Sequence, residues 1–197
     1  MLSLLLPIAA YFLGSVSSAI IVSKLMGLPD PRTSGSKNPG ATNVLRLGGK
    51  KAAAIALLGD VLKGLVPVLV AKTLTDSSLT IALVGIAAFL GHLYPIFFGF
   101  KGGKGVATAA GVFIGLSGIV TMILVAIWLI TAFISRYSSL AALVATVTAP
   151  FLVLLFLPGL PYFLMACAIA GLLFWRHREN ISRIKSGEES KIRLSRR

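Results

Sequence analysis

The sequence predicts an all-α integral membrane protein. Of its 197 residues, 56% are hydrophobic and only 13% are charged, and the mean hydropathy is +0.92. The apolar stretches reach the roughly 20 residues that a helix needs to cross a hydrocarbon core of about 30 Å, and they lack the alternating pattern of barrel strands. These observations exclude an ordinary soluble protein. We expect a single membrane-embedded domain over residues 1–197, with no soluble domain attached.

Six apolar stretches are candidate spans. The first has no positive residue before Lys24, so we expect a retained helix, although residues 15–19 resemble the small-residue cleavage region of a signal peptide. In chain order the stretches are Leu4–Ser23, Ala52–Ala71, Ser77–Phe100, Gly105–Ser135, Ser139–Leu157 and Leu160–Trp175.

The fourth stretch is too long for one crossing. A single helix over 105–135 would measure about 46 Å at 1.5 Å per residue, well beyond the hydrocarbon thickness. We expect a turn near residues 115–118 and two short helices, formed either across a locally thinned bilayer or as a re-entrant pair. All lysines and arginines except Lys63 and Lys72 then lie on one side, which the positive-inside rule makes cytoplasmic. The sequence thus predicts seven transmembrane helices, with the N-terminus outside and the C-terminus in the cytoplasm.

The net charge of +13 has two ordinary explanations, orientation in the membrane and attraction to anionic headgroups. The basic residues lie in short loops without a nucleic-acid-binding module, so nucleic acid is not an expected partner. The single cysteine, Cys167, excludes a disulfide framework. The glycines at 111, 115 and 118 allow close helix packing, within one chain or between chains, and the oligomeric state is not readable from the sequence.

The glycine-rich segment Lys101–Gly105 lies between two uncharged stretches and has the composition of an anion site at the membrane boundary. Glycines let backbone amides approach a ligand, the start of the next helix offers N–H groups, and lysine adds charge. The alternative is a tight turn whose lysines only set the topology. The segment is not a nucleotide-binding P-loop, because Phe98 and Gly105 replace the required glycine and hydroxyl residue.

The loop after the first stretch is rich in hydroxyl, amide and backbone donors and has almost no acid after Asp30. Such a loop can fold as successive turns around an oxyanion, although the same residue types occur in any loop. Its candidate donors are Ser36, Asn38, Thr42, Asn43 and Arg46.

Ionisable residues within the spans have a structural interpretation. Asp60 and Lys63 are three residues apart on one helix face, so we expect a mutually neutralising pair that supports packing. His92 is expected to be a hydrogen-bonded packing residue. The hydroxyls of Tyr137, Ser138 and Ser139 are placed to cap a helix, with contact to an anion as the alternative.

Near the C-terminus, His177 and Asn180 share a face if the last helix continues into the cytosol.

Together these segments resemble the bacterial acyl-phosphate:glycerol-3-phosphate acyltransferase family (PlsY), over almost the whole chain. One departure is Lys37, where we expect glycine in the pattern Gly-Ser-Gly-Asn. The matching motifs are Gly-Ser-x-Asn-Pro-Gly-Ala-Thr-Asn-Val-Leu-Arg at 35–46, Gly-Asp-Val-Leu-Lys-Gly at 59–64, Gly-His-Leu-Tyr-Pro at 91–95, Phe-Lys-Gly-Gly-Lys-Gly-Val-Ala-Thr at 100–108, Ser-Arg-Tyr-Ser-Ser at 135–139, His-Arg-Glu-Asn-Ile at 177–181 and Gly-Glu at 187–188.

The resemblance implies a multi-pass enzyme of the bacterial inner membrane with its active site at the cytoplasmic face. It implies acyl transfer from acyl phosphate to glycerol 3-phosphate, giving lysophosphatidic acid for phospholipid synthesis and inorganic phosphate, with no cofactor, nucleotide or metal. The residues it implicates in catalysis are Lys104, His177 and Asn180. Those it implicates in phosphate binding are Ser36, Asn38, Thr42, Arg46, Gly102, Gly103, Lys104, Gly105 and Ser139.

The chain has no Ser-His-Asp pattern and no cysteine in its loops. Because acyl phosphate is already activated, we expect direct attack by the glycerol 3-phosphate hydroxyl, assisted by the substrate's own phosphate. His177 is the competing general base. A small anion transporter or channel is the alternative function, but donor-rich motifs on one side and the lack of an internal repeat favour the enzyme. A non-catalytic subunit of a membrane complex would leave the donor-rich loops without a role.

Overall fold

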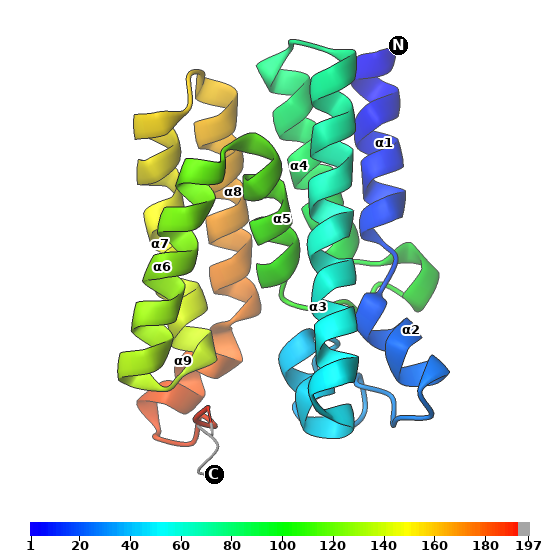
Figure 1. Cartoon of the computed structure of the whole chain (residues 1–197), viewed down its shortest axis with the longest axis vertical. Coiled ribbons are helices and arrows are strands. Elements are labelled where there is room, and N and C mark those ends of the chain that lie inside the picture. Colours follow the sequence, from blue (N-terminus) through cyan, green and yellow to red (C-terminus); the bar gives the residue numbers. More distant parts are fainter. Residues whose placement is uncertain (193–197) are drawn as a thin grey trace. The chain divides into compact units, whose positions relative to one another are not determined.

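The computed structural model describes residues 1–192, and within them it contains helices and no β-strand (Figure 1). Contacts divide the chain into two compact units, Met1–Leu116 and the part from Ser117 onward. The basic residues 193, 196 and 197, which the sequence assigns to the cytoplasmic side, lie outside the described residues.

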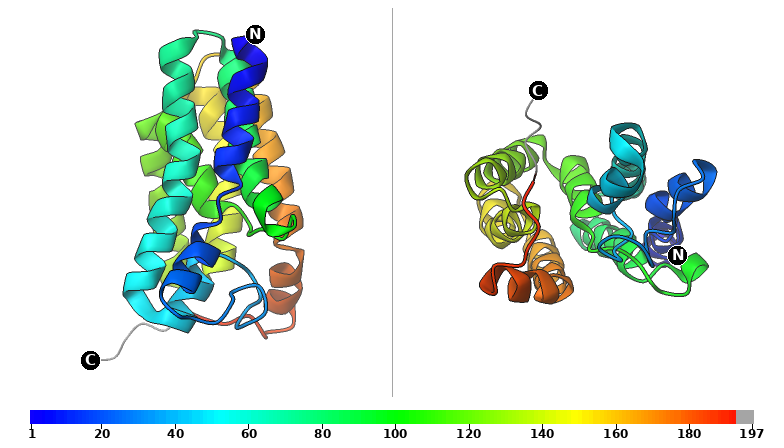
Figure 2. Two further views of the ribbon diagram at one scale, coloured as in Figure 1. Left: turned by 90° about the vertical axis from the view of Figure 1, so that its right-hand side faces the viewer. Right: turned by 90° about the horizontal axis from the view of Figure 1, so that it is seen from below.

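The first unit consists of five α-helices and one 3-10 turn, which can be followed in Figures 1 and 2. Helices α1 and α4 lie side by side, as do α3 and α5. The bounds are α1 Leu2–Gly14, α2 Ser18–Leu25, α3 Ala41–Leu74, α4 Ser78–Leu93, η1 Ile96–Phe98 and α5 Val106–Leu116.

The second unit is a bundle of three long helices followed by a short one. Helix α7 packs against both α6 and α8, and α9 is bent by 55° from α8. The bounds are α6 Gly118–Ser135, α7 Ser138–Phe156, α8 Leu160–Arg176 and α9 Arg178–Lys185.

Within residues 1–192, five helical segments are long and apolar enough to cross a membrane, or six if the bent α8–α9 pair is one span. The all-helical membrane class predicted from composition is therefore confirmed. The expected break in 105–135 is also confirmed, because α5 ends at Leu116 and α6 starts at Gly118. Only α5, with 11 residues, is short. The expectation that both helices are short was wrong, because α6 continues for 18 residues before Arg136 turns the chain in a left-handed conformation.

Helix α3 begins earlier than the apolar pattern indicates. The sequence predicts one loop over residues 24–51, but α3 starts at Ala41, after Gly40 as N-cap residue. Gly49 has φ +77°, which separates a short helical segment with Thr42, Asn43 and Arg46 from the longer apolar part of α3. Hydropathy detects only the apolar part, because the segment before Gly49 contains polar and basic side chains.

Glycines bring α3 and α5 into close contact. A Cβ at Gly64 would collide with the carbonyl oxygen of Thr108, and one at Gly111 would collide with that of Val61. Gly115 packs against Val68, whereas nothing lies near Gly118. The glycines at 111 and 115 thus pack within the chain.

Candidate functional site

Asn43 organises the first donor-rich loop. Its side chain is 1% exposed, and its Nδ2 donates to the carbonyl oxygens of Pro31 (3.0 Å) and Ser34 (2.9 Å). Its Oδ1 accepts from the backbone N–H of Ser36 at 2.9 Å. The Asn43 amide therefore holds the loop together, which is a structural role and not the ligand donation considered from the sequence.

The loop uses two residues in the left-handed region. Gly35 has φ +63° and Lys37 has φ +55°. At Gly35 a Cβ would collide with Oδ1 of Asn43, so the close approach requires glycine. Lys37 occupies a conformation that glycine adopts without strain. The glycine expected at position 37 from the family pattern therefore has a physical reason, and the lysine retains the turn at an energetic cost.

The predicted donors of this loop are available at its surface. Ser36, Thr42 and Arg46 are exposed and Asn38 is half-buried. Thr42 and Arg46 lie on the first turns of α3, where the free N–H groups of a helix N-terminus favour anions.

The acid at the start of the loop is neutralised locally. Nε of Arg32 donates to Asp30 Oδ1 (3.0 Å) and Nη2 donates to Oδ2 (2.6 Å). The hydrogen bond from the Arg32 side chain lowers the pKa of the Asp30 carboxyl, although burial opposes the shift. Asp30 is thus charged and paired, and it leaves the donors farther along the loop without a competing carboxylate.

The glycine segment is shaped by close contacts on both sides. Gly102, Gly103 and Gly105 are buried and Lys104 is half-buried. A Cβ at Gly102 would collide with the carbonyl oxygen of His92. A Cβ at Gly105, which has φ +88°, would collide with the ring of Phe89. The chain then enters α5, whose first turn is closed by a 2.8 Å hydrogen bond from Ala109 N–H to the Gly105 carbonyl. The segment therefore places backbone amides and Lys104 at a helix N-terminus, as the sequence predicted for an anion site.

The two donor-rich segments meet at Gly103. A Cβ on this residue would lie 2.9 Å from the carbonyl oxygen of Pro39 and would collide with Nε2 of His92. The structure thus brings together, within one unit, the loop that contains Ser36 and Asn38 and the segment that contains Lys104.

Next to the glycine segment lies a buried ionic cluster. Nζ of Lys63 is 2.8 Å from Oδ1 of Asp60, and it donates to the carbonyl oxygen of Val16 at 2.8 Å. This carbonyl belongs to the break between α1 and α2. The expectation of a neutralising Asp60–Lys63 pair is confirmed.

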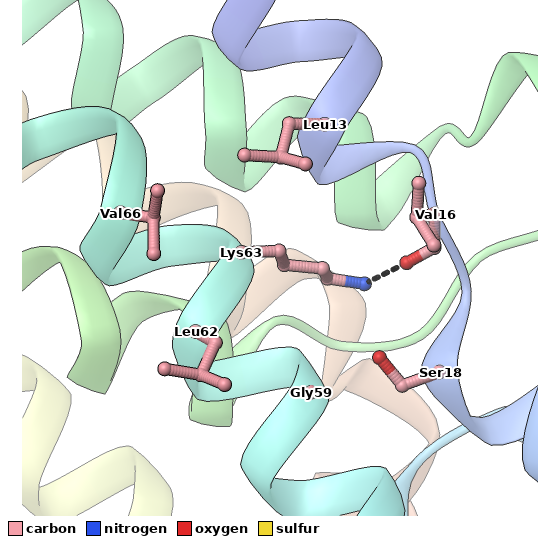
Figure 3. Close-up of a pocket in the computed structure, with 7 residues that line it drawn as sticks. All are labelled: Leu13, Val16, Ser18, Gly59, Leu62, Lys63 and Val66. Carbon is pink, nitrogen blue, oxygen red and sulfur yellow. Dashed lines mark hydrogen bonds between the residues drawn. The ribbon is translucent and has the colours of Figure 1, made fainter. Parts of the chain in front are cut away.

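The same lysine borders a cavity of about 260 Å³ (Figure 3). The lining is largely apolar, and Figure 3 shows the Lys63 ammonium directed at the Val16 carbonyl. The cavity is lined by Leu13, Val16, Ser18, Gly59, Leu62, Lys63 and Val66.

In the second unit, Glu189 joins two of the predicted site residues. Its Oε1 accepts from Ser139 Oγ and from Asn180 Nδ2, both at 2.6 Å, and its Oε2 accepts from Nε of Arg183 at 2.9 Å. Burial raises the pKa of the Glu189 carboxyl, but the hydrogen bonds from Ser139, Arg183 and Asn180 outweigh it, so the pKa is lower than usual. Glu189 is therefore a charged acceptor between α7 and α9.

This contact changes the interpretation of Ser139. The hydroxyls after Arg136 were expected to cap the helix, but Tyr137 is the N-cap residue of α7 and no side chain caps it. The Ser139 proton is instead donated to Glu189, because a carboxylate lies across from the helix start.

His177 lies at the bend between α8 and α9 and is 3% exposed. Its Nδ1 is 2.8 Å from the Leu173 carbonyl oxygen. Because a carbonyl can only accept, Nδ1 carries the proton and Nε2 is the acceptor of the neutral ring. Asn180 follows on the first turn of α9 and is 6% exposed. Nε2 of His177 is therefore the ring nitrogen that does not contact the Leu173 carbonyl.

Sequence reasoning missed Glu189 as a contributor and considered Asn43 only as a ligand donor, not as the residue that holds the loop together. Asn43 could have been recognised by its place in a turn-rich segment, where amides bond to nearby backbone. Glu189 lies 50 residues from Ser139, and no local pattern distinguishes it from its neighbour Glu188.

Comparisons with known proteins agree on one family. The family model described as glycerol-3-phosphate acyltransferase matches residues 4–187. A glycerol-3-phosphate acyltransferase of Methylococcus capsulatus is 54% identical over 189 residues, covering 96% of this chain and 95% of the relative. One of Thioalkalivibrio sulfidiphilus is 56% identical over 187 residues, covering 95% and 92%.

Two crystal structures are also similar. PlsY (YgiH), described as an integral membrane glycerol 3-phosphate acyltransferase, matches in its glycerol 3-phosphate form with a TM-score of 0.93 and 42% identity, covering 97% of this chain and 96% of that one. The lysophosphatidic acid form matches with a TM-score of 0.90 and 40% identity, covering 97% and 95%.

Proposed function

Because the chain belongs to the glycerol-3-phosphate acyltransferase family and is therefore an acyltransferase, we propose that it transfers a fatty acyl group from acyl phosphate to the sn-1 hydroxyl of glycerol 3-phosphate. The products are lysophosphatidic acid and inorganic phosphate. The glycerol 3-phosphate and lysophosphatidic acid forms of the structural relative support this choice of acceptor and product. An activated acyl phosphate fits a chain without a recognisable protein nucleophile.

The observation that carries the proposal is the contact between the two donor-rich segments. Gly103 lies against Pro39, so the loop with Ser36 and Asn38 adjoins the segment with Lys104. Two phosphate-bearing substrates require such a concentration of hydrogen-bond donors and positive charge. Ser36, Asn38, Thr42 and Arg46 are its proposed side-chain donors, and Gly102, Gly103 and Gly105 its proposed backbone cradle.

The proposed reaction is a direct displacement. The primary hydroxyl of glycerol 3-phosphate attacks the acyl carbonyl, a new ester bond forms, and the bond between the acyl carbon and the phosphate oxygen breaks. The hydroxyl proton passes to a substrate phosphate oxygen. Lys104 stabilises the charge that develops on the phosphate and the carbonyl oxygen, and the loops supply positioning.

Residues of the second unit have proposed roles by their place in the family motif. His177 and Asn180 take part in the same reaction, with His177 either contacting phosphate or competing with the substrate as general base through Nε2. A His177→Asn variant that keeps most of its turnover would remove the general-base role.

We further propose seven transmembrane helices in one domain over 1–197, with the N-terminus outside, the C-terminus in the cytoplasm and the active site at the cytoplasmic face of the bacterial inner membrane. The distribution of lysine and arginine supports this orientation. Labelling of cysteines introduced at Lys50 and at Asp76 tests it: only the Asp76 position should react with a membrane-impermeant reagent added outside intact cells.

Phosphate release from palmitoyl phosphate tests the activity. The purified protein in lipid should release phosphate and form lysophosphatidate only when glycerol 3-phosphate is present, and EDTA should not prevent it. Lys104→Ala should abolish turnover in a folded variant, whereas Lys101→Ala, in the exposed lysine of the same segment, should retain it. A folded, lipid-supplied protein without product across several acyl-chain lengths would contradict the proposal and redirect attention to anion flux in liposomes.

A further inference from the structure

Three ionisable side chains are buried in the membrane-spanning part of the first unit. Asp60 is 2% exposed, and Lys63 and His92 are each 5% exposed. Placing such groups away from water is costly unless each has a partner, and removal of one partner leaves an uncompensated charge. Asp60 and Lys63 already neutralise each other, so charge balance does not require a third ionisable residue. The additional histidine calls for a separate explanation.

His92 extends the cluster to the glycine segment. Its Nδ1 is 3.7 Å from Oδ1 of Asp60, which is an electrostatic contact beyond hydrogen-bond range. The opposite ring nitrogen, Nε2, adjoins Gly103, and the His92 carbonyl adjoins Gly102. One side of the ring therefore faces the carboxylate, and the other faces the segment that precedes Lys104.

The charge of Asp60 selects the state of the ring. A carboxylate beside Nδ1 favours the tautomer with its proton on Nδ1, which leaves Nε2 as an acceptor on the side of Gly103. Lys63 in turn fixes Asp60, because Nζ pairs with the carboxylate at 2.8 Å and also donates to the Val16 carbonyl at the helix break (Figure 3). The ring consequently has little freedom to rotate away from the glycine segment.

We propose that His92 is a positioning residue, held by Asp60, that fixes the backbone of Gly102 and Gly103 in the conformation that binds a substrate phosphate. His92 acts through the segment and does not contact the substrate. This inference rests on the proposed function, because it assigns the glycine segment to phosphate binding.

Two isosteric variants separate this role from simple neutralisation of Asp60. The side-chain amide of His92→Gln can replace Nε2 beside Gly103, whereas that of His92→Asn can replace only Nδ1 beside Asp60. We expect His92→Asn to raise the KM for a phosphate substrate about tenfold or more, and His92→Gln, which keeps a group beside Gly103 but loses the Asp60 contact, to raise it severalfold at most.

The KM is the informative measurement, because a purely structural role would lower the fraction of active enzyme and leave the KM unchanged. KM values for glycerol 3-phosphate and for palmitoyl phosphate are measured separately, with unfolding temperatures alongside. Equal effects of the two variants, or an unchanged KM in both, would overturn the proposal.

A double variant decides the question if His92→Asn does not fold. Asp60→Asn combined with Lys63→Met removes both charges at nearly constant volume, a change that buried ion pairs often tolerate. The ring then loses the carboxylate that orients it, so the KM should rise severalfold; an unchanged KM would overturn the role of Asp60. Absence of turnover in the wild-type protein would instead contradict the proposed function itself.

Discussion

Glu189 holds the side-chain amide of Asn180 through a hydrogen bond of 2.6 Å from Nδ2 to Oε1. Since a carboxylate can only accept, Asn180 must present its NH₂ group to Glu189. The amide orientation is thereby fixed, and Oδ1 of Asn180 is directed away from Glu189 as an acceptor.

Glu189→Gln should weaken both stability and activity. A glutamine has one acceptor oxygen in place of two, so its NH₂ group must face either the donors of Ser139 and Asn180 or the guanidinium of Arg183. About 1–3 kcal/mol of unfolding free energy should therefore be lost. Turnover should fall by about tenfold to a hundredfold because Asn180 is no longer fixed. Thermal unfolding and phosphate release measure the two effects.

Glu188→Gln is the matched control, since Glu188 is the exposed neighbour of Glu189. Glu188→Gln should change the unfolding free energy by no more than about 0.5 kcal/mol and the turnover by no more than about a factor of two. Equal behaviour of the two glutamine variants would show that the contacts of Glu189 have no influence on Asn180.

The stabilising effect of Glu189 should depend on pH in one direction. Its folded-state pKa is lower than the ordinary value of 4.5, so the contribution is complete above pH 4.5 and is lost as the pH falls through the folded-state value. The difference in unfolding temperature between wild type and Glu189→Gln should thus be constant from about pH 8 to pH 5.5 and shrink below pH 4.5. A difference that grew on acidification would contradict the lowered pKa.

The membrane class of the fold could be predicted because burial in lipid imposes long apolar segments that are visible without any knowledge of contacts. The break at Ser117 was also predictable, since a run of 31 uncharged residues exceeds one crossing. The polar first segment of α3 was not, because its helical state depends on the N-cap at Gly40 and on the Asn43 contacts, and hydropathy is insensitive to both.

In the candidate site, too, some features could be predicted from the sequence and others could not. Lys104 and its neighbouring glycines could be recognised from the sequence, because consecutive residues supply both the positive charge and the glycines that allow close backbone approach. The contacts of Glu189 and the approach of His92 to Gly103 depend on distant partners, which only the folded chain brings near.

Lys37→Gly should stabilise the protein. Lysine at φ +55° is in a conformation that costs a residue with a side chain about 1 kcal/mol relative to glycine. We therefore expect the unfolding free energy to rise by about 0.5–1 kcal/mol, measured by thermal unfolding in one lipid composition.

Lys37→Ala provides the comparison, because it removes the charge and keeps the Cβ. Its stability should remain within about 0.5 kcal/mol of wild type. If alanine stabilises as much as glycine, the effect arises from the lysine charge and not from the backbone.

Gly111→Ala should destabilise the first unit, although alanine is the better helix former. A Cβ at this position would collide with the Val61 carbonyl oxygen and lie 2.9 Å from the Leu65 nitrogen, and neither backbone can move without separating α3 from α5. The cost of such overpacking is about 1–3 kcal/mol.

Gly171→Ala in α8 is the control, since nothing lies within 4 Å of its Cβ position, and it should be neutral or stabilising by up to about 1 kcal/mol. Thermal unfolding of the two variants in the same lipid distinguishes the cases. If Gly111→Ala unfolds at or above the wild-type temperature, the close packing of α3 against α5 does not depend on glycine.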